Sequence, residues 1–127
     1  MKTKELQKLI DEYRYWDMRV TKLECDYFAD EITLAYHNTE GYEVVYKFYK
    51  CYKVIFDHVK VYDKLMPAKE MRISQIPYFM QDVQVTDILE GDIQFYICKI
   101  DMFPLDVEIW SKEIKITQKK KQFDGAL

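Results

Sequence analysis

Large apolar and polar side chains alternate along residues 42–62, whose sequence is YEVVYKFYKCYKVIFDHVKVY. One parity of this stretch is almost entirely aromatic or β-branched, whereas the residues between include charged side chains such as Glu43, Lys47, Lys53 and Asp57. A period of two with this composition is typical of strands that bury one face and expose the other. The pattern therefore predicts sheet structure, and it contains no residue spacing that is typical of a catalytic motif.

Residues 42–62 are too many for one ordinary strand. Fully extended, the 21 residues would span roughly 70 Å, whereas strands of globular proteins usually have ~3–10 residues. Lys50 falls on the apolar parity, while Tyr49 and Cys51 are apolar on the opposite one. We therefore expect a bulge or bend near Lys50 that divides the stretch into two strands, near residues 42–49 and 51–61. Because such local contradictions often mark strained or functional positions, Tyr49, Lys50 and Cys51 are candidate functional residues.

The chain begins with a pattern that predicts a helix over residues 1–17. Leu6, Leu9, Ile10, Tyr13 and Trp16 follow the i, i+3, i+4, i+7 spacing of one apolar stripe. Further strands are expected near residues 18–25, 32–36, 83–89, 93–102, 105–109 and 114–116, with a change of parity near residues 111–113.

These elements predict an α+β fold that is mostly antiparallel β. The N-terminal amphipathic helix would be followed by about seven strands in a bent sheet, a sandwich or a partly open barrel. The length of 127 residues is that of a single domain. We expect the helix at residues 1–17, a β-rich body at 18–117 and a frayed tail at 118–127.

Composition excludes several classes of function. The net charge of −3 gives no overall attraction for nucleic acid or for an anionic membrane. Neither a signal-peptide core nor a run of about 18 apolar residues is present, so the expected location is the cytoplasm. Cys25, Cys51 and Cys98 are widely spaced and form no CxxC pair, which argues against disulfides and zinc. We expect no cofactor and no metal.

Few residues suggest catalysis. The sequence leans against enzymatic activity without excluding it, and it assigns no catalytic residue. Asp57 and His58 could form an oriented base, but neighbours in a strand point to opposite faces, so the two side chains would not meet. Carboxylates that could form a glycosidase-like or metal-binding pair are better explained as solvated turn residues. They are Asp30, Glu31, Asp82, Asp87, Glu90, Asp92, Asp101 and Asp106.

Two surfaces for macromolecules can be suggested. Lysines at positions 47, 50, 53, 60 and 64, interleaved with tyrosines, could bind single-stranded nucleic acid, although their spacing of three does not match a strand. Tyr78, Phe79 and Met80 follow Pro77 and could form a protein interface, because exposed Tyr and Met often anchor one. Alternatively, this segment packs beneath the sheet as a small satellite core.

The order of several segments resembles small bacterial β-rich families, some of which are immunity proteins found beside secreted toxins. The resemblance rests on the first helix, the segment Phe28-Ala29-Asp30-Glu31-Ile32, the aromatic strand pair and the final PLDVEI strand at residues 104–109. It assigns no functional residue. It implies an acidic, non-catalytic protein that neutralises a partner by binding it, and an acidic surface would suit a basic toxin such as a nuclease.

The sequence therefore favours a non-catalytic protein-binding module whose partner is another protein or a second copy, and the resemblance implies a module of the immunity type. The alternatives are a small-ligand-binding or enzymatic β-domain with a pocket lined by carboxylates and tyrosines, and a binder of single-stranded nucleic acid. A binder should expose a flat aromatic and acidic patch. An enzyme should instead show a deep pocket in which polar groups converge.

Overall fold

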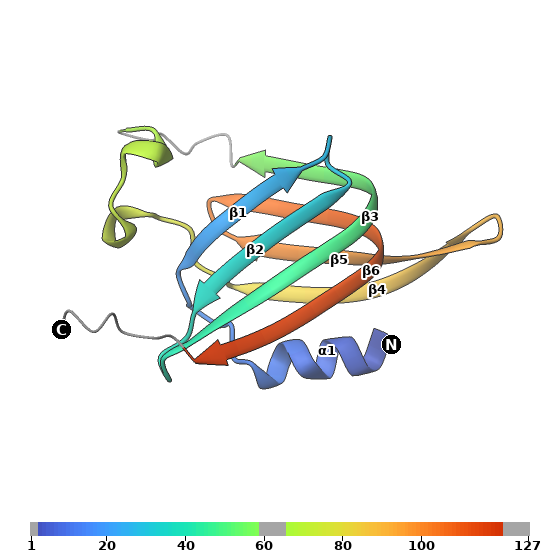
Figure 1. Ribbon diagram of the computed structural model, residues 1–127, viewed down its shortest axis with the longest axis horizontal. Coiled ribbons are helices and arrows are strands. Elements are labelled where there is room, and N and C mark those ends of the chain that lie inside the picture. Colours follow the sequence, from blue (N-terminus) through green and yellow to red (C-terminus); the bar gives the residue numbers. More distant parts are fainter. Residues whose placement is uncertain (1–2, 59–65, 121–127) are drawn as a thin grey trace.

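The computed structural model describes residues 3–58 and 66–120, which form one helix and six strands (Figure 1). The helix α1 (Thr3–Glu12) precedes β1 (Val20–Asp26), β2 (Glu31–His37) and β3 (Tyr42–His58). Two single-turn 3-10 helices, η1 (Ala68–Glu70) and η2 (Ile73–Gln75), follow. The chain then forms β4 (Asp82–Glu90), β5 (Ile93–Met102) and β6 (Leu105–Lys120). No helix within these described ranges has both the length and the apolar character needed to span a membrane.

All six strands belong to one open sheet in the order β1-β2-β3-β6-β5-β4, and every neighbouring pair is antiparallel. The predicted fold class is therefore confirmed: a helix followed by a bent, mostly antiparallel β structure. The chain has six strands instead of about seven because β3 continues through Lys50. Of the second strand expected at residues 51–61, residues 59–61 lie outside the described part of the chain.

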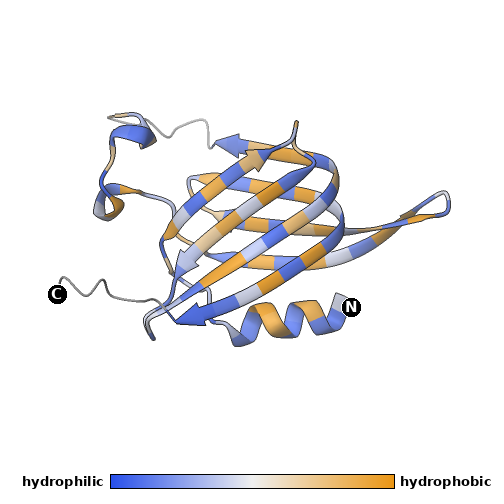
Figure 2. Cartoon of the chain, viewed as in Figure 1, coloured by the Kyte–Doolittle hydropathy of each residue, from blue (hydrophilic) through white to orange (hydrophobic). Residues whose placement is uncertain are grey.

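The sheet folds over on itself, so that β1, β2 and the first part of β3 lie across β5 and β4 (Figure 1). A single hydrophobic core contains buried side chains from α1 and from every strand. Apolar and polar residues alternate along the strands, as Figure 2 shows, because one face of each strand points into this core. One row across the sheet illustrates the register: Val54, Ile109, Cys98 and Val85 are successive partners.

Helix α1 covers part of the β4 edge (Figure 1). Leu6 and Ile10 are buried in the core. Gln7 lies between them and uses its side-chain amide to donate to the Val83 carbonyl (2.9 Å) and to accept from the Val85 N–H (2.8 Å). The amide therefore occupies backbone groups that an edge strand would otherwise leave unpaired.

The helix is shorter than the sequence predicts. It ends at Glu12 instead of residue 17, and Arg14 then adopts a positive φ of 46°, which a right-handed helix cannot contain. The helical stripe therefore stops before Trp16, whose side chain is 68% exposed.

The two edges of the sheet approach each other at one end. The Met80 N–H donates to the Met18 carbonyl (2.8 Å), and the Val20 N–H donates to the Tyr78 carbonyl (2.9 Å). These bonds join the start of β1 and the residues before it to the segment before β4, across 58 and 62 positions of the sequence. They hold residues 78–80 against the core while the rest of the sheet stays open.

A bend crosses β3 and β6 together. Lys50 has a φ of 53°, and the register shifts by one residue between Cys51 and Lys53, so the bulge expected near Lys50 is confirmed. It bends one 17-residue strand, and the expected division into two strands is wrong. Core-facing residues of β6 change parity between Ser111 and Ile116 within one continuous strand.

The C-terminal part of the body also extends further than the sequence predicts. Residues 118–120, expected in a frayed tail, belong to β6, where they pair with the start of β3. The remaining residues of the expected tail, 121–127, lie outside the described part.

Candidate functional site

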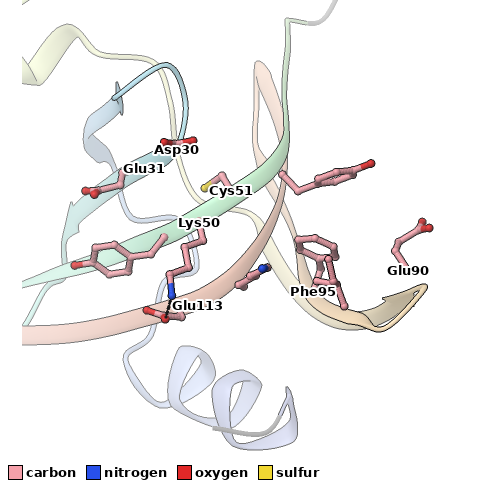
Figure 3. Close-up of a pocket in the computed structure, with 11 residues that line it drawn as sticks. Asp30, Glu31, Lys50, Cys51, Glu90, Phe95 and Glu113 are labelled. Carbon is pink, nitrogen blue, oxygen red and sulfur yellow. Dashed lines mark hydrogen bonds and ion pairs between the residues drawn. The ribbon is translucent and has the colours of Figure 1, made fainter.

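An open groove of about 710 Å³ lies at the bend of the sheet, and we call it the corner groove. Figure 3 shows its lining residues, which come from the start of β2, the bend of β3 and β6, and the β4–β5 hairpin. They include all three residues that the sequence singled out at the pattern break. The lining consists of Asp30, Glu31, Tyr49, Lys50, Cys51, Tyr52, Glu90, Ile93, Phe95, Lys112 and Glu113.

The turn that leads into the groove has an unusual backbone. Tyr27, Phe28 and Ala29 all have positive φ, at 53°, 58° and 72°, a conformation that costs L-residues roughly 1–2 kcal/mol each. The side chains of Tyr27 and Phe28 are exposed, that of Phe28 completely. Strained backbone of this kind concentrates at binding sites and persists only where the surroundings enforce it.

The β3 bulge is tied directly to this turn. The Cys51 N–H donates a 3.0 Å hydrogen bond to the Asp30 carbonyl, so the backbone at the register shift supports the backbone next to the strained turn. Lys50 adds a fourth strained residue beside it. The turn before β2 and the β3 bulge, which form one side of the corner groove, are therefore fixed relative to each other by a backbone hydrogen bond.

Aromatic rings form the apolar side of the groove. Tyr52 lies at the register shift between Cys51 and Lys53, and its ring lies 4.9 Å from that of Phe95 and 6.3 Å from that of Trp110. Tyr52 is 67% exposed, whereas Phe95 beneath it is only 4% exposed. Ile93, also in the lining, is exposed as well. Exposed rings held on a rigid base are typical anchors of protein interfaces.

The groove is acidic overall. Four carboxylates in its lining stand against two lysines, Lys50 and Lys112, which gives a formal charge of −2. Lys50 pairs with Glu113 (3.1 Å), and Lys47 from outside the lining pairs with Glu31 (3.6 Å). Among the described residues Asp30 and Glu90 have no such ion pair, so the groove retains negative charge for a partner.

The chemistry of the groove does not favour a thiol nucleophile. Burial raises the pKa of the Cys51 thiol to about 11, and the nearby Asp30 carboxylate contributes in the same direction. A thiol with this pKa stays protonated near neutral pH, whereas the thiolate is the reactive form. Cys98 is completely buried, which raises its pKa to about 12.

Asp57 and His58 do not form a catalytic pair. Asp57 pairs in register with Asp106 and His58 with Leu105, so their side chains lie on opposite faces of β3. The His58 Nε2 atom lies 2.8 Å from the hydroxyl of Tyr78. His58 thus contacts the core-side segment, while Asp57 remains on the outside of the sheet.

The proposed interface at Tyr78, Phe79 and Met80 is largely inside the molecule. Tyr78 is 9% exposed and Met80 is 0% exposed, because the backbone bonds to Met18 and Val20 draw this segment into the core. Phe79 is partly exposed and lies under the Arg19 guanidinium, 4.8 Å from the ring centroid. Tyr78 and Met80 are therefore core residues and do not face a partner.

The lysines of β3 do not form a free basic stripe. Lys47 and Lys50 are paired with carboxylates, and Lys53 lies over the Trp110 ring at 4.9 Å. Lys60 and Lys64 are outside the described residues. These three lysines of β3 thus do not offer a free phosphate-binding surface for a single strand of nucleic acid.

Sequence reasoning found the bend and named several carboxylates of the groove, but it missed the aromatic and apolar side. Ile93 and Phe95 reach it only through the pairing of β5 with β6, which is not visible in a local pattern. Tyr52 had a local signal, since it directly follows the contradictory residues 49–51. The strained turn had a weaker signal in two adjacent aromatic residues between strands.

The fold and the groove together define a small open-sheet protein with a preformed, acidic and aromatic surface site. The model of the family Immunity protein PIM7 matches residues 2–118. The chain therefore belongs to the immunity protein PIM7 family, and the likeness to immunity proteins expected from the sequence is confirmed. Among curated proteins, none matches the sequence.

Proposed function

We propose that this chain neutralises a partner protein, a toxin, by binding it and without catalysing a reaction. The observation that carries the proposal is membership of an immunity protein family over residues 2–118. The proposal places the chain in the cytoplasm of a bacterial cell that must be protected from the toxin.

The corner groove supports binding as the mode of neutralisation. It is open, the bond between Cys51 and Asp30 fixes the bulge against the turn that leads into it, and its lining presents the exposed ring of Tyr52. A preformed surface loses little conformational entropy when a partner binds. Aromatic side chains at the centre of an interface commonly contribute most of the binding free energy.

A small-ligand site is the second candidate, because the groove volume of about 710 Å³ lies within the range of ligand pockets. The lining also contains the tyrosines and carboxylates that such a site would use. Its openness favours a protein partner, since ligand pockets enclose most of a small molecule's surface.

The direct test is co-expression in a bacterial host with the toxic domain encoded by the gene beside the gene for this chain. We expect restored growth and a stoichiometric complex on size-exclusion chromatography. The toxic domain, released from the complex by denaturation and refolded, should have an unchanged mass and full toxicity. A cleaved or covalently modified toxic domain would instead show that the chain acts as an enzyme, and absence of both protection and complex would contradict the proposal.

Two variants test the proposed interface, Tyr52→Ala in the groove lining and Phe28→Ala in the turn that leads into the groove. Phe28→Ala and Tyr52→Ala should each weaken the complex by roughly tenfold or more, as expected for a central aromatic anchor. Trp16→Ala is the matched control, because Trp16 is as exposed as Tyr52 but is not part of the groove lining. If Trp16→Ala weakens the complex and Tyr52→Ala does not, the partner binds elsewhere.

A further inference from the structure

The outer faces of the two halves of the sheet differ in how far their carboxylates are paired with cations. On the half formed by β1, β2 and the start of β3, three strand carboxylates are paired with cations, whereas Asp26, which pairs in register with Glu31, has no such ion pair among the described residues. Glu24 lies 3.7 Å from Lys22, Glu31 lies 3.6 Å from Lys47, and Glu43 lies 3.6 Å from the His37 ring. Most of the charge on this outer face is therefore compensated within the sheet itself, whereas on the other half the described ion pair joins Glu108 to Lys99 (3.9 Å).

On the other half, the strand register brings four aspartates into one row. Asp57 of β3 is the partner of Asp106 of β6, Asp106 is the partner of Asp101 of β5, and Asp101 is the partner of Asp82 of β4. All four are exposed, and none forms an ion pair with any other described residue. We call them the aspartate row.

The fold does not explain the aspartate row. Like charges directly opposite each other in neighbouring strands are destabilising, and here three such pairs adjoin one another. Asp82 accepts a local hydrogen bond from the Gln84 side chain and Asp101 accepts one from the Phe103 N–H, and Asp82 also interacts with the Tyr15 hydroxyl. A group of residues that lowers stability and makes no compensating structural contact is typical of a functional surface.

Two further rows complete this outer face, and they connect the aspartate row with the aromatic end of the corner groove. Ile55, Glu108, Lys99 and Gln84 are successive partners, and so are Lys53, Trp110, Ile97 and Thr86. The Trp110 ring in the last row lies 6.3 Å from that of Tyr52. The face carries five carboxylates and two lysines, a formal charge of −3.

The aspartate row borders a second hollow, of about 310 Å³, whose lining also includes Ile55 and Lys99. Among the described residues, no group of three or more histidines, cysteines or carboxylates could hold a metal ion. The hollow is large enough for the end of an arginine or lysine side chain, and Arg binds carboxylates through several parallel hydrogen bonds.

We infer that this outer face docks a basic surface of the partner protein, with arginine or lysine side chains of the partner lying along the aspartate row. The inference rests on the proposed function, and it adds the contact surface and the charge of the partner. A basic partner is favoured by charge complementarity. A second copy of the chain would bring one aspartate row against an equally acidic face, and nucleic acid would be repelled by it.

The test compares two triple variants that change the net charge equally. Asp57→Asn, Asp101→Asn and Asp106→Asn together remove charge from the row, and Glu24→Gln, Asp26→Asn and Glu43→Gln remove it from the compensated half. Association of each variant with the toxic domain encoded by the neighbouring gene is followed by stopped-flow fluorescence between 20 and 500 mM NaCl. Circular dichroism verifies that both variants fold.

The row variant should associate about tenfold more slowly at low salt, and its association rate should depend less on salt than that of the original chain. The control variant should change by less than a factor of about three. Equal effects of the two variants, or no effect of the row variant, would overturn the inference. So would an association rate that rises with salt, because that indicates an acidic partner.

If Tyr52→Ala weakens the complex and the row variant does not, the proposed function stands and the inference fails. If the original chain does not bind at all, the proposed function itself fails.

Discussion

The backbone N–H of Cys51 donates a 3.0 Å hydrogen bond to the carbonyl of Asp30. This bond joins the β3 bulge to the β1–β2 turn, so two strained backbone segments support each other. Four non-glycine residues with positive φ, at positions 27, 28, 29 and 50, lie on either side of it. These four strained conformations therefore belong to one hydrogen-bonded unit, and a substitution at one of the four residues tests whether its conformation costs stability.

Replacing Lys50 with glycine should stabilise the protein relative to alanine at the same position. Both variants lose the exposed ion pair with Glu113, which contributes little, but only glycine adopts a φ of 53° without steric cost. We expect Lys50→Gly to be about 1 kcal/mol more stable than Lys50→Ala, measured by urea unfolding. Equal stabilities would show that the bend imposes no strain at Lys50.

Replacing Gln7 with alanine should destabilise the fold and uncover the β4 edge. The Gln7 amide bonds with Val83 and Val85, and leaving such backbone groups unpaired costs about 1–3 kcal/mol. Urea unfolding should show this loss, and light scattering should show concentration-dependent self-association through the exposed edge. Lys8→Ala, on an exposed position of α1, is the control. A Gln7→Ala protein that remains monomeric would mean that other features protect this edge.

The protein should lose stability at high pH. Burial raises the pKa of Tyr36 from 10.0 to about 12 and that of Cys98 from 9.0 to about 12. The unfolded chain therefore releases protons from these groups at lower pH than the folded chain does. Their stabilising contribution is complete below about pH 9 and decreases as the pH rises to about 12.

The Tyr36→Phe variant isolates the contribution of the Tyr36 hydroxyl to this loss of stability at high pH. Two pKa units correspond to about 3 kcal/mol, so the unfolding free energy of the variant should fall less steeply between pH 10 and 12. The variant also loses the bond from the Tyr36 hydroxyl to the Tyr13 carbonyl, which lowers stability at every pH and does not affect the slope. Tyr27→Phe controls for loss of a phenol from the surface. Identical slopes for Tyr36→Phe and the original chain would contradict the assignment.

Replacing Asp106 with asparagine should raise stability. Asp106 stands between Asp57 and Asp101 in the aspartate row, so the change relieves two like-charge contacts, with a gain on the order of 0.5 kcal/mol. Thermal unfolding should show a higher Tm at 20 mM salt, and the difference should shrink at 500 mM. Glu113→Gln, which removes an ion pair, should not raise Tm. A lower Tm for Asp106→Asn at low salt would mean that the row is stabilised by contacts that this residue makes.

Tyr78 and Phe79 should respond very differently to truncation. Tyr78→Ala removes a ring from the core and should cost about 3–5 kcal/mol. Phe79→Ala removes a partly exposed ring and its contact with Arg19, which should cost about 1 kcal/mol. Urea unfolding measures both. Comparable losses would contradict the division of this segment into core and surface residues.

Local sequence patterns were sufficient for the strands and for the bend, because alternation and its interruption are read within a few residues of Lys50. They were insufficient for the segment around Tyr78, whose burial depends on pairing with Met18 and Val20 far away in the chain. An aromatic segment after a proline looks the same in sequence whether it faces the core or solvent.

The aspartate row also depends on strand pairing that local sequence patterns do not reveal. Asp101 and Asp106 flank the tight turn at Phe103 and Pro104, so their pairing could be deduced from the hairpin between residues 93 and 109. Asp57 and Asp82 join them only because β6 pairs with β3 and β5 pairs with β4. Each aspartate alone is an ordinary solvated strand-end residue, and the register across four strands makes the surface.

The position of β6 affects the order in which the sheet can form while the chain is being synthesised. β6 is the last strand in chain order among the described elements, but it lies in the middle of the sheet between β3 and β5. While the ribosome is still extending the chain, β1–β2–β3 and β4–β5 can form only as separate pieces with open inner edges. The aspartate row is incomplete until β6 emerges, because Asp106 lies in β6 and joins Asp57 to Asp101, and chains that still lack β6 would need shielding from aggregation.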